Sequence, residues 1–275
     1  MRIVALTVPG EAAELAADRL WTAGARAVEE RDAGDGLVEL RTSLGSDDAV
    51  AGDRLGEIPV DWSVAFVEVD PRPAETWREF AQPIVVSEHL VIRPAWHSDS
   101  RRPGVLDVAI EPGGAFGLGD HPTTRATAAV VDDLVRPGQH VLDVGCGSGV
   151  LAIVAARRGA ARVVAIDIAE PAREATEDNA RRNGVADSVE ASTTPLGDVD
   201  GRFDLVLANI LAPALVALAP DLRRVTAEQG RLVISGVLTG EYDQVVAALA
   251  PMRVVASRDV DGWSAVTLAH ATATG

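Results

Sequence analysis

Residues 141–152 read Val-Leu-Asp-Val-Gly-Cys-Gly-Ser-Gly-Val-Leu-Ala, and this stretch decides the fold. Its apolar start predicts a buried strand over His140 to Val144, and its end opens a helix expected from Val150 to Arg158. Three glycines separate the strand from the helix: Gly145, Gly147 and Gly149. Glycine leaves these three positions of the turn without side chains, and the helix behind the turn begins with unpaired backbone N–H groups. A ligand can therefore pass close to the backbone here.

Helices and apolar strands alternate from Thr123 onward, which predicts a parallel sheet covered by helices on both faces. The other expected helices are 123–134 and 171–183. The other expected strands are 162–166, 203–208, 230–235, 253–259 and 263–269. The fold class is therefore α/β, with a Rossmann-like domain over residues 113–275.

The first quarter of the chain predicts a separate, smaller domain. Its expected elements are a strand at 2–8, a helix at 11–23, strands at 27–31 and 37–41, a weak helix, and a strand at 62–69. This β-α-β-β-α-β order is the ferredoxin-like arrangement, so we expect an α+β domain over residues 1–70. The stiff stretch Asp70-Pro71-Arg72-Pro73 marks the boundary, and we expect residues 71–112 to form a linker and a preface to the main domain. The preface has a short helix at 75–80 and extended segments at 84–86, 90–92 and 105–110.

Charge and composition exclude several classes of function. The 275 residues carry 41 acids against 25 basic residues, a net charge of -16, so a phosphate backbone would be repelled and nucleic acid is not expected as a direct partner. Residues 1–70 hold 15 acids and 6 arginines, a net of -9, which would attract a basic partner or simply serve solubility. No apolar run reaches membrane-spanning length, and the start of the chain is unlike a signal peptide. With the single Cys146, these features predict a cytoplasmic protein.

Two carboxylates beside the glycine turn indicate the kind of ligand. Asp167 ends the next strand, where it can accept hydrogen bonds from both hydroxyls of a ribose. Asp143 lies just before the glycines, where it can meet a cationic amine. Gly147-x-Gly149-x-x-Ala152 also satisfies the relaxed glycine pattern of nicotinamide dinucleotide domains, so the turn alone leaves both cofactors open. Two features favour S-adenosyl-L-methionine over a dinucleotide: the position of Asp143, and the presence of motifs for only one nucleotide half-site.

Two further segments combine capping chemistry with features suited to a ligand. The first reads Phe116-Gly-Leu-Gly-Asp-His-Pro-Thr-Thr124 and ends like the start of a helix. Capping does not explain its pair of glycines beside an aromatic residue and a histidine. The second reads Asn209-Ile-Leu-Ala212 and follows a strand. Asn209 can cap the next helix, but it also lies where ligands bind in this fold class.

Together these motifs resemble the PrmA-type methyltransferases, which modify the stalk-base protein of the large ribosomal subunit. That family typically has a Phe-Gly-Thr-Gly-Thr-His-Pro-Thr-Thr loop, an Asp-x-Gly-Cys-Gly-Ser-Gly turn, a Gly-Ile-Asp-Ile segment and an Asn-Ile-Leu-Ala segment. The corresponding stretches here are 116–124, 143–149, 165–168 and 209–212. Residues 77–84 and 90–96 also look like the family's segment between domains, so the resemblance covers nearly the whole chain. Leu118 and Asp120 depart from it, since they replace two threonines of the loop.

The resemblance implies a class I methyltransferase fold and a lysine N-methyltransferase that uses S-adenosyl-L-methionine. It places cofactor contacts on Thr124, Gly145, Asp167 and Asn209, beside Asp143, Gly147 and Gly149 of the glycine turn. The small domain would capture a basic ribosomal protein, and the products would be methylated lysines and an N-terminal amine. The protein is expected to act as a monomer.

For the catalytic step, we expect Asn209 to aim the substrate amine and either His121 or Asp120 to assist, unless His121 only makes a loop or helix-start hydrogen bond. Cys146 stands alone, so no metal is expected. Three other classes stay open: a small-molecule methyltransferase, a nicotinamide-dependent oxidoreductase and a non-catalytic ribosome-assembly factor.

Overall fold

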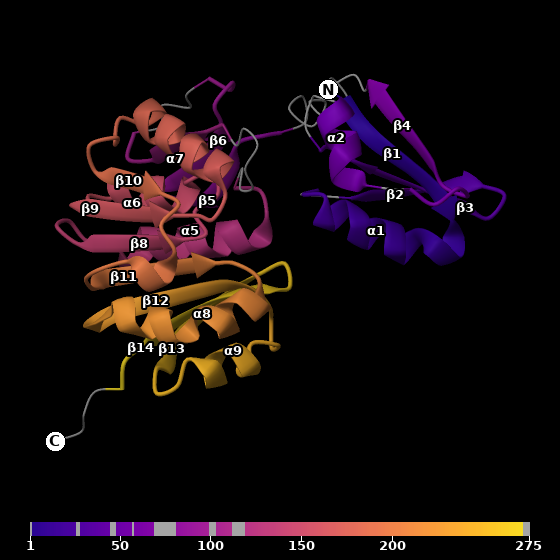
Figure 1. Cartoon of the computed structure of the whole chain (residues 1–275). Helices are drawn as coiled ribbons and strands as arrows, with labels where there is room; N and C mark the ends of the chain where they lie inside the picture. Colours follow the sequence, from indigo (N-terminus) through magenta and orange to yellow (C-terminus); the bar gives the residue numbers. More distant parts are fainter. Residues whose placement is uncertain are drawn as a thin grey trace. The chain divides into compact units, whose positions relative to one another are not determined.

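A computed structural model describes residues 2–25, 28–44, 48–56, 58–68, 81–98, 103–111 and 119–271. The chain divides into two compact units, Met1–Ala81 and Gln82–Gly275 (Figure 1). Each unit has a buried apolar core of its own. The linker expected at residues 70–73 and the helix expected at 75–80 lie outside the described residues.

The described part of the first unit has the expected β-α-β-β-α-β order. Its elements are β1 (Arg2–Pro9), the 3-10 helix η1 (Gly10–Ala12), α1 (Ala13–Thr22), β2 (Glu29–Gly34), β3 (Leu37–Thr42), α2 (Asp48–Leu55) and β4 (Ser63–Glu68). The antiparallel sheet has the order β2-β3-β1-β4, which is the ferredoxin-like arrangement. Strand β2 runs to Gly34, beyond its expected end at Arg31. The reason is the tight turn: Asp35 and Gly36 have φ of 53° and 77°, which fits a two-residue hairpin.

The second unit contains a three-stranded sheet, a seven-stranded sheet and their covering helices (Figure 1). Its first elements are β5 (Ile84–Ser87), β6 (Leu90–Pro94), β7 (Leu106–Ile110), α5 (Pro122–Leu134), β8 (His140–Val144), α6 (Val150–Arg157), β9 (Arg162–Ile166) and α7 (Glu170–Arg182). The others are β10 (Val189–Ser192), the 3-10 helix η2 (Leu196–Asp198), β11 (Phe203–Asn209), α8 (Ala212–Val225), β12 (Thr226–Leu238), α9 (Asp243–Ala248), β13 (Arg253–Val260) and β14 (Trp263–Ala269).

The large sheet has the order β10-β9-β8-β11-β12-β14-β13. Strands β10, β9, β8, β11 and β12 are parallel, as expected. The expectation of a sheet parallel throughout is wrong, because β14 is antiparallel to both of its neighbours. Only Asp261 and Gly262 separate β13 from β14, with φ of 47° and 82°. A two-residue turn can join antiparallel strands, whereas a parallel connection needs a long crossover.

The central strands are buried on both faces. Val141 and Leu142 are neighbours on β8 and point to opposite faces, and both are 0% exposed. On one face Leu142 and Val206 share a core with Leu215 of α8. On the other face, α5 and α6 pack against each other and against the sheet. Helices therefore cover both faces of the sheet.

The strands β5 to β7 belong to the second unit and pack against its helices. Ser87 Oγ donates a hydrogen bond of 2.9 Å to Asp132 Oδ2 of α5. Arg158, directly after α6, forms an ion pair with Asp132 and donates to the His89 carbonyl at 2.8 Å. In the described ranges, no helix is both long and apolar enough to cross a membrane.

Candidate active site

The glycine turn lies at the carboxyl end of β8, as predicted. Gly145, Gly147 and Gly149 have φ of 75°, 54° and 79°, a region that glycine adopts without strain. A Cβ at Gly145 would lie 2.3 Å from Ile210 Cγ2, so a side chain has no room there. Gly145 follows β8 and Ile210 follows β11. From β8 the chain continues to β9 on one side in the sheet order, and from β11 it continues to β12 on the other side, so the two connections diverge between β8 and β11. Ligands of open parallel sheets bind at such a point.

The carboxylate of Asp167 lies beside this turn. Its Oδ2 accepts a hydrogen bond of 3.0 Å from Gly147 N, and its Oδ1 accepts one of 3.0 Å from Ala169 N. Asp167 is half-buried, and an ionised carboxylate has about four acceptor positions. Two positions therefore remain for the hydroxyls of a ribose, which suits the role predicted for Asp167.

Thr124 and Asn209 are the third group of predicted residues, and they connect the first turn of α5 to the carboxyl end of β11. Asn209 is the last residue of β11, and its Nδ2 donates to Thr124 Oγ1 across 3.4 Å. Thr124 is 2% exposed, whereas Asn209 is half-buried. Two segments that lie 85 residues apart in the sequence thus meet at the carboxyl end of β11. Phe116, Gly117 and Leu118 of the predicted loop lie outside the described residues.

His121 caps α5. Its Nδ1 accepts a hydrogen bond of 3.3 Å from Thr123 N and lies 2.8 Å from Thr123 Oγ1. Its ring meets Trp263 edge to face, with 5.2 Å between the ring centroids. The helix-start alternative for His121 is therefore confirmed, and a catalytic contribution from it stays a prediction.

Asp143 is 1% exposed, and its Oδ2 accepts a hydrogen bond of 3.1 Å from Ala152 N in α6. The pKa of Asp143 is raised to about 7, chiefly by burial; the hydrogen bond from the Ala152 N–H opposes this increase, and the negative charge of Asp167 adds to it. The carboxylate thus braces the first turn of α6. Its predicted contact with a cofactor amine stays a prediction.

We expect the stability of the wild-type protein, relative to Asp143→Asn, to fall by roughly 2–3 kcal/mol between about pH 5 and pH 8. The folded pKa lies above the ordinary value of 3.8, so the folded protein binds this proton more tightly than the unfolded chain. The resulting stabilisation is complete below that ordinary pKa and is lost as the pH rises through about 7. Chemical denaturation of both proteins across this range measures the effect. A stability difference that does not vary with pH would contradict it.

Cys146 is buried in the turn, where its Sγ lies 3.3 Å from Thr176 Oγ1 and can share the hydroxyl proton that Thr176 also directs to the Gly147 carbonyl. Burial, with the nearby charge of Asp143, raises the pKa of its thiol well above the ordinary range, so the reactive thiolate is disfavoured. Among the residues that the structure describes, no group of three His, Cys, Asp or Glu side chains is placed to hold a metal ion.

Sequence analysis missed the contribution of α7. Thr176 Oγ1 donates to the Gly147 carbonyl at 3.1 Å, and Asn179 Nδ2 donates to the Ser148 carbonyl at 3.0 Å. Both side chains are 0% exposed. The signal available in the sequence was a pair of uncharged polar residues, three positions apart on a highly charged helix. Residues at this spacing lie on one face of the helix, and polar groups that are buried there need specific hydrogen-bond partners.

Comparison with known proteins identifies close similarity to one family. The family model described as ribosomal protein L11 methyltransferase (PrmA) matches residues 63–270. The ribosomal protein L11 methyltransferase of Geotalea daltonii is 40% identical over 208 residues, 71% of this chain and 66% of the relative. That of Geobacter sulfurreducens is 42% identical over 203 residues, 74% of this chain and 66% of the relative.

A solved structure supports the same relationship. The crystal structure of ribosomal protein L11 methylase from Lactobacillus delbrueckii subsp. bulgaricus is 34% identical, with a TM-score of 0.63 over 69% of this chain and 98% of that chain. The chain spans just under two thirds, 66%, of the length of the first two curated relatives. The family match leaves residues 1–62 outside, so the resemblance expected over nearly the whole chain is confirmed for residues 63–270.

Proposed function

Because the chain belongs to the ribosomal protein L11 methyltransferase (PrmA) family, we propose that it transfers methyl groups from S-adenosyl-L-methionine to amino groups of ribosomal protein L11. The acceptors are lysine side chains, with the N-terminal amine as a further acceptor. The family match carries the proposal, because the matched residues 63–270 include every residue of the candidate site. A ribosomal substrate would place the enzyme in the cytoplasm.

The described residues fit S-adenosyl-L-methionine. The glycine turn presents bare backbone, and a side chain at Gly145 would collide with Ile210. Asp167 keeps acceptor positions for the ribose beside Gly147 N. When bound, the cofactor would supply a methyl group on a sulfonium, whose departure needs no proton. The chain then needs mainly to orient the acceptor and to exclude water.

Asn209 is suited to orienting the acceptor amine. Its Nδ2 is directed to Thr124 Oγ1, which leaves its Oδ1 to accept an N–H from the substrate. An amine held in this way would point its lone pair at the methyl group. The amine must be neutral, and transfer from water into a dry site beside a cation lowers its pKa. A dedicated base is therefore not required, and His121 can remain a helix cap.

The first unit is the part we assign to substrate capture. Residues 1–70 carry a net charge of -9 from 15 acids and 6 arginines, which complements a basic protein. The same charge disfavours direct nucleic-acid binding. We propose that the chain acts as a monomer, with residues 1–70 recognising the substrate, residues 71–112 leading into the main domain, and residues 113–275 binding the cofactor.

The sheet topology argues against a nicotinamide-dependent oxidoreductase. Dinucleotide domains have the strand order 3-2-1-4-5-6, built from two nucleotide-binding halves. In this sheet the antiparallel strand β14 lies between β12 and β13, which interrupts the second half. A small-molecule methyltransferase and a non-catalytic assembly factor share the fold and are distinguished by experiment.

The test is methyl transfer from labelled S-adenosyl-L-methionine to unmethylated ribosomal protein L11, followed by mass analysis. We expect label on the substrate's lysines, and clearly less label at subsaturating cofactor with Asp167→Ala, which should bind the cofactor roughly tenfold or more weakly. The chain contains no lysine, so a labelled lysine can come only from the substrate. Cofactor binding by calorimetry without label would reject L11 as substrate. Binding of a nicotinamide cofactor instead would favour the oxidoreductase.

A further inference from the structure

Among the residues that the structure describes, β7 is an edge strand of the three-stranded sheet β5-β6-β7, and Glu111 directly follows it. Two asparagines at the end of α7 hold this edge. Asn179 Oδ1 accepts from Glu111 N at 2.9 Å, and its Nδ2 donates to the Glu111 carbonyl at 2.7 Å. Asn183 makes the same two bonds with Ala109, at 2.9 and 2.7 Å. The two amides therefore satisfy backbone groups that a neighbouring strand would otherwise pair.

The spacing of the asparagines explains this fit. Four residues along a helix rise by about 6.0 Å, and two residues along a strand span about 6.6 Å. Side chains at positions i and i+4 of α7 can therefore reach alternate residues of the edge. Asn179 and Asn183 each make the same pair of backbone hydrogen bonds at this edge, so a substitution of one is the control for a substitution of the other.

Only Asn179 also contacts the glycine turn. Its Nδ2 donates to the Ser148 carbonyl at 3.0 Å, and its Oδ1 accepts a bond of 3.1 Å from Arg182 Nη1. With Glu111, these bonds use both donors and both acceptor positions of the amide. Asn183 directs its remaining bond back to the Asn179 carbonyl, at 2.8 Å. The described hydrogen bonds of the Asn183 side chain are thus confined to the helix and the edge of β7.

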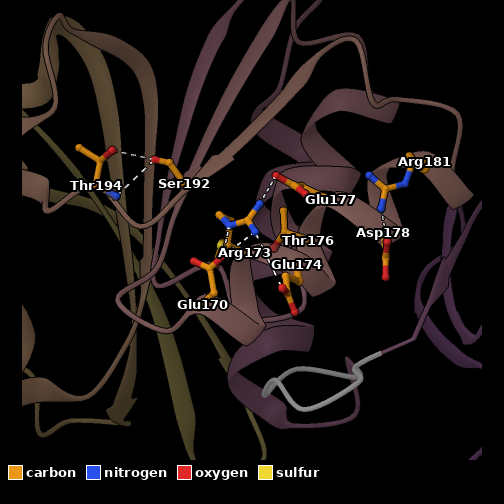
Figure 2. A network of polar contacts seen from close by, with 10 residues as sticks. Glu170, Arg173, Glu174, Thr176, Glu177, Asp178, Arg181, Ser192 and Thr194 are labelled. Atoms are coloured by element: carbon orange, nitrogen blue, oxygen red, sulfur yellow. Dashed lines mark hydrogen bonds and ion pairs between the residues drawn. The ribbon is translucent and has the colours of Figure 1, made fainter.

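The rest of α7 supports this division of roles. Figure 2 shows Arg173 between Glu170 and Glu177 in ion pairs, and Asp178 paired with Arg181. These charged side chains are partly or largely exposed, whereas Asn179 is 0% exposed. One turn of helix before Asn179, Thr176 holds the neighbouring Gly147 carbonyl at 3.1 Å. Two successive carbonyls of the glycine turn are therefore held from α7.

We propose that Asn179 is a positioning residue for the cofactor site. Its amide fixes the backbone of the glycine turn at Ser148 to Glu111, which directly precedes in sequence the segment 112–121 that leads into α5. Without this amide, the Ser148 and Glu111 carbonyls each lose one hydrogen bond, and the turn loses one of its two described supports from α7. The inference rests on the proposed binding of S-adenosyl-L-methionine at this turn.

Asn179→Ala and Asn183→Ala form the matched pair that tests the role. We expect both to lower the melting temperature of the ligand-free protein. Asn179→Ala should also raise the dissociation constant for S-adenosyl-L-methionine roughly tenfold, whereas Asn183→Ala should leave it within about twofold of wild type. Calorimetry below both melting temperatures measures these constants on folded protein. A purely structural role would lower both melting temperatures and leave both dissociation constants unchanged.

Hydrogen exchange on the wild-type protein tests the same link without a variant. The cofactor should slow exchange of the Glu111 amide, which is bonded to Asn179, more than that of the Ala109 amide, which is bonded to Asn183. Equal slowing at both amides, or equal cofactor affinity for wild type and Asn179→Ala, would overturn the inference. A wild-type protein that does not bind S-adenosyl-L-methionine would instead reject the proposed function.

Discussion

Deletion of residues 1–81 should abolish methylation of ribosomal protein L11 and leave the affinity for S-adenosyl-L-methionine within about twofold of the full chain. The first unit has a core of its own, formed by residues such as Leu6 and Leu40. The second unit has a separate core, built around residues such as Leu142 and Leu215. Because all of the residues proposed to bind the cofactor belong to the second unit, that unit should fold and bind cofactor without the first. Label transfer and calorimetry on the truncated chain measure the two properties.

Asp167→Ala in the full chain is the control with the opposite defect. It keeps the first unit, and so should keep binding to L11, but should lose cofactor affinity. A truncated chain that methylates L11 at the wild-type rate would show that the acidic unit has no part in substrate capture. Loss of cofactor binding on truncation would show that the two units do not fold independently.

The positions of the glycine turn and of Asp167 were predictable because they depend on local sequence. An apolar strand, a turn with three glycines and a helix follow one another directly, and Asp167 comes immediately after the next strand. Their contacts with the cofactor stay a prediction. Asn209 was predictable from topology because it ends a parallel strand, whereas Thr124 lies in the first turn of α5 and was expected only from the family resemblance.

Other features depend on tertiary contacts or on weak local signals. Strand β10 has only four residues, Val-Glu-Ala-Ser, and shows no clear alternation. Helix α8 contains Pro220 and depends on burial of residues such as Leu215 and Leu222. Strand β12 starts at Thr226, four residues before the expected Gly230. The antiparallel β14 was readable from Asp261-Gly262, a strong hairpin signal that the alternation of helices and strands obscured.

The roles of single side chains were the hardest to predict. Asp143 was expected to face a ligand, yet its described contact is the Ala152 N–H beneath the turn. Asn179 gave no motif, because its partners Glu111 and Ser148 lie 68 and 31 residues away. Such contacts arise only once the fold has brought distant segments together.

Asn209→Ala should lower kcat roughly 100-fold, with a smaller change in the dissociation constant for S-adenosyl-L-methionine. The amide is proposed to aim the acceptor amine in the transition state, and alanine keeps the backbone but removes both the donor and the acceptor. Single-turnover methylation of L11 at saturating cofactor separates the chemical step from binding. Equal losses in cofactor affinity and turnover would indicate that Asn209 only holds the cofactor.

Thr124 provides a graded test of the same arrangement. Thr124→Ser keeps the hydroxyl that accepts the Asn209 Nδ2 hydrogen bond, whereas Thr124→Val keeps the shape and removes the hydroxyl. If the bond fixes the direction of the amide, the valine variant should lose roughly tenfold in kcat and the serine variant should stay near wild type. In the Asn209→Ala background the valine change should have little further effect, because the group that it orients is gone. Full additivity of the two substitutions would mean that they act separately, and Asn209 would then have to be oriented by another contact.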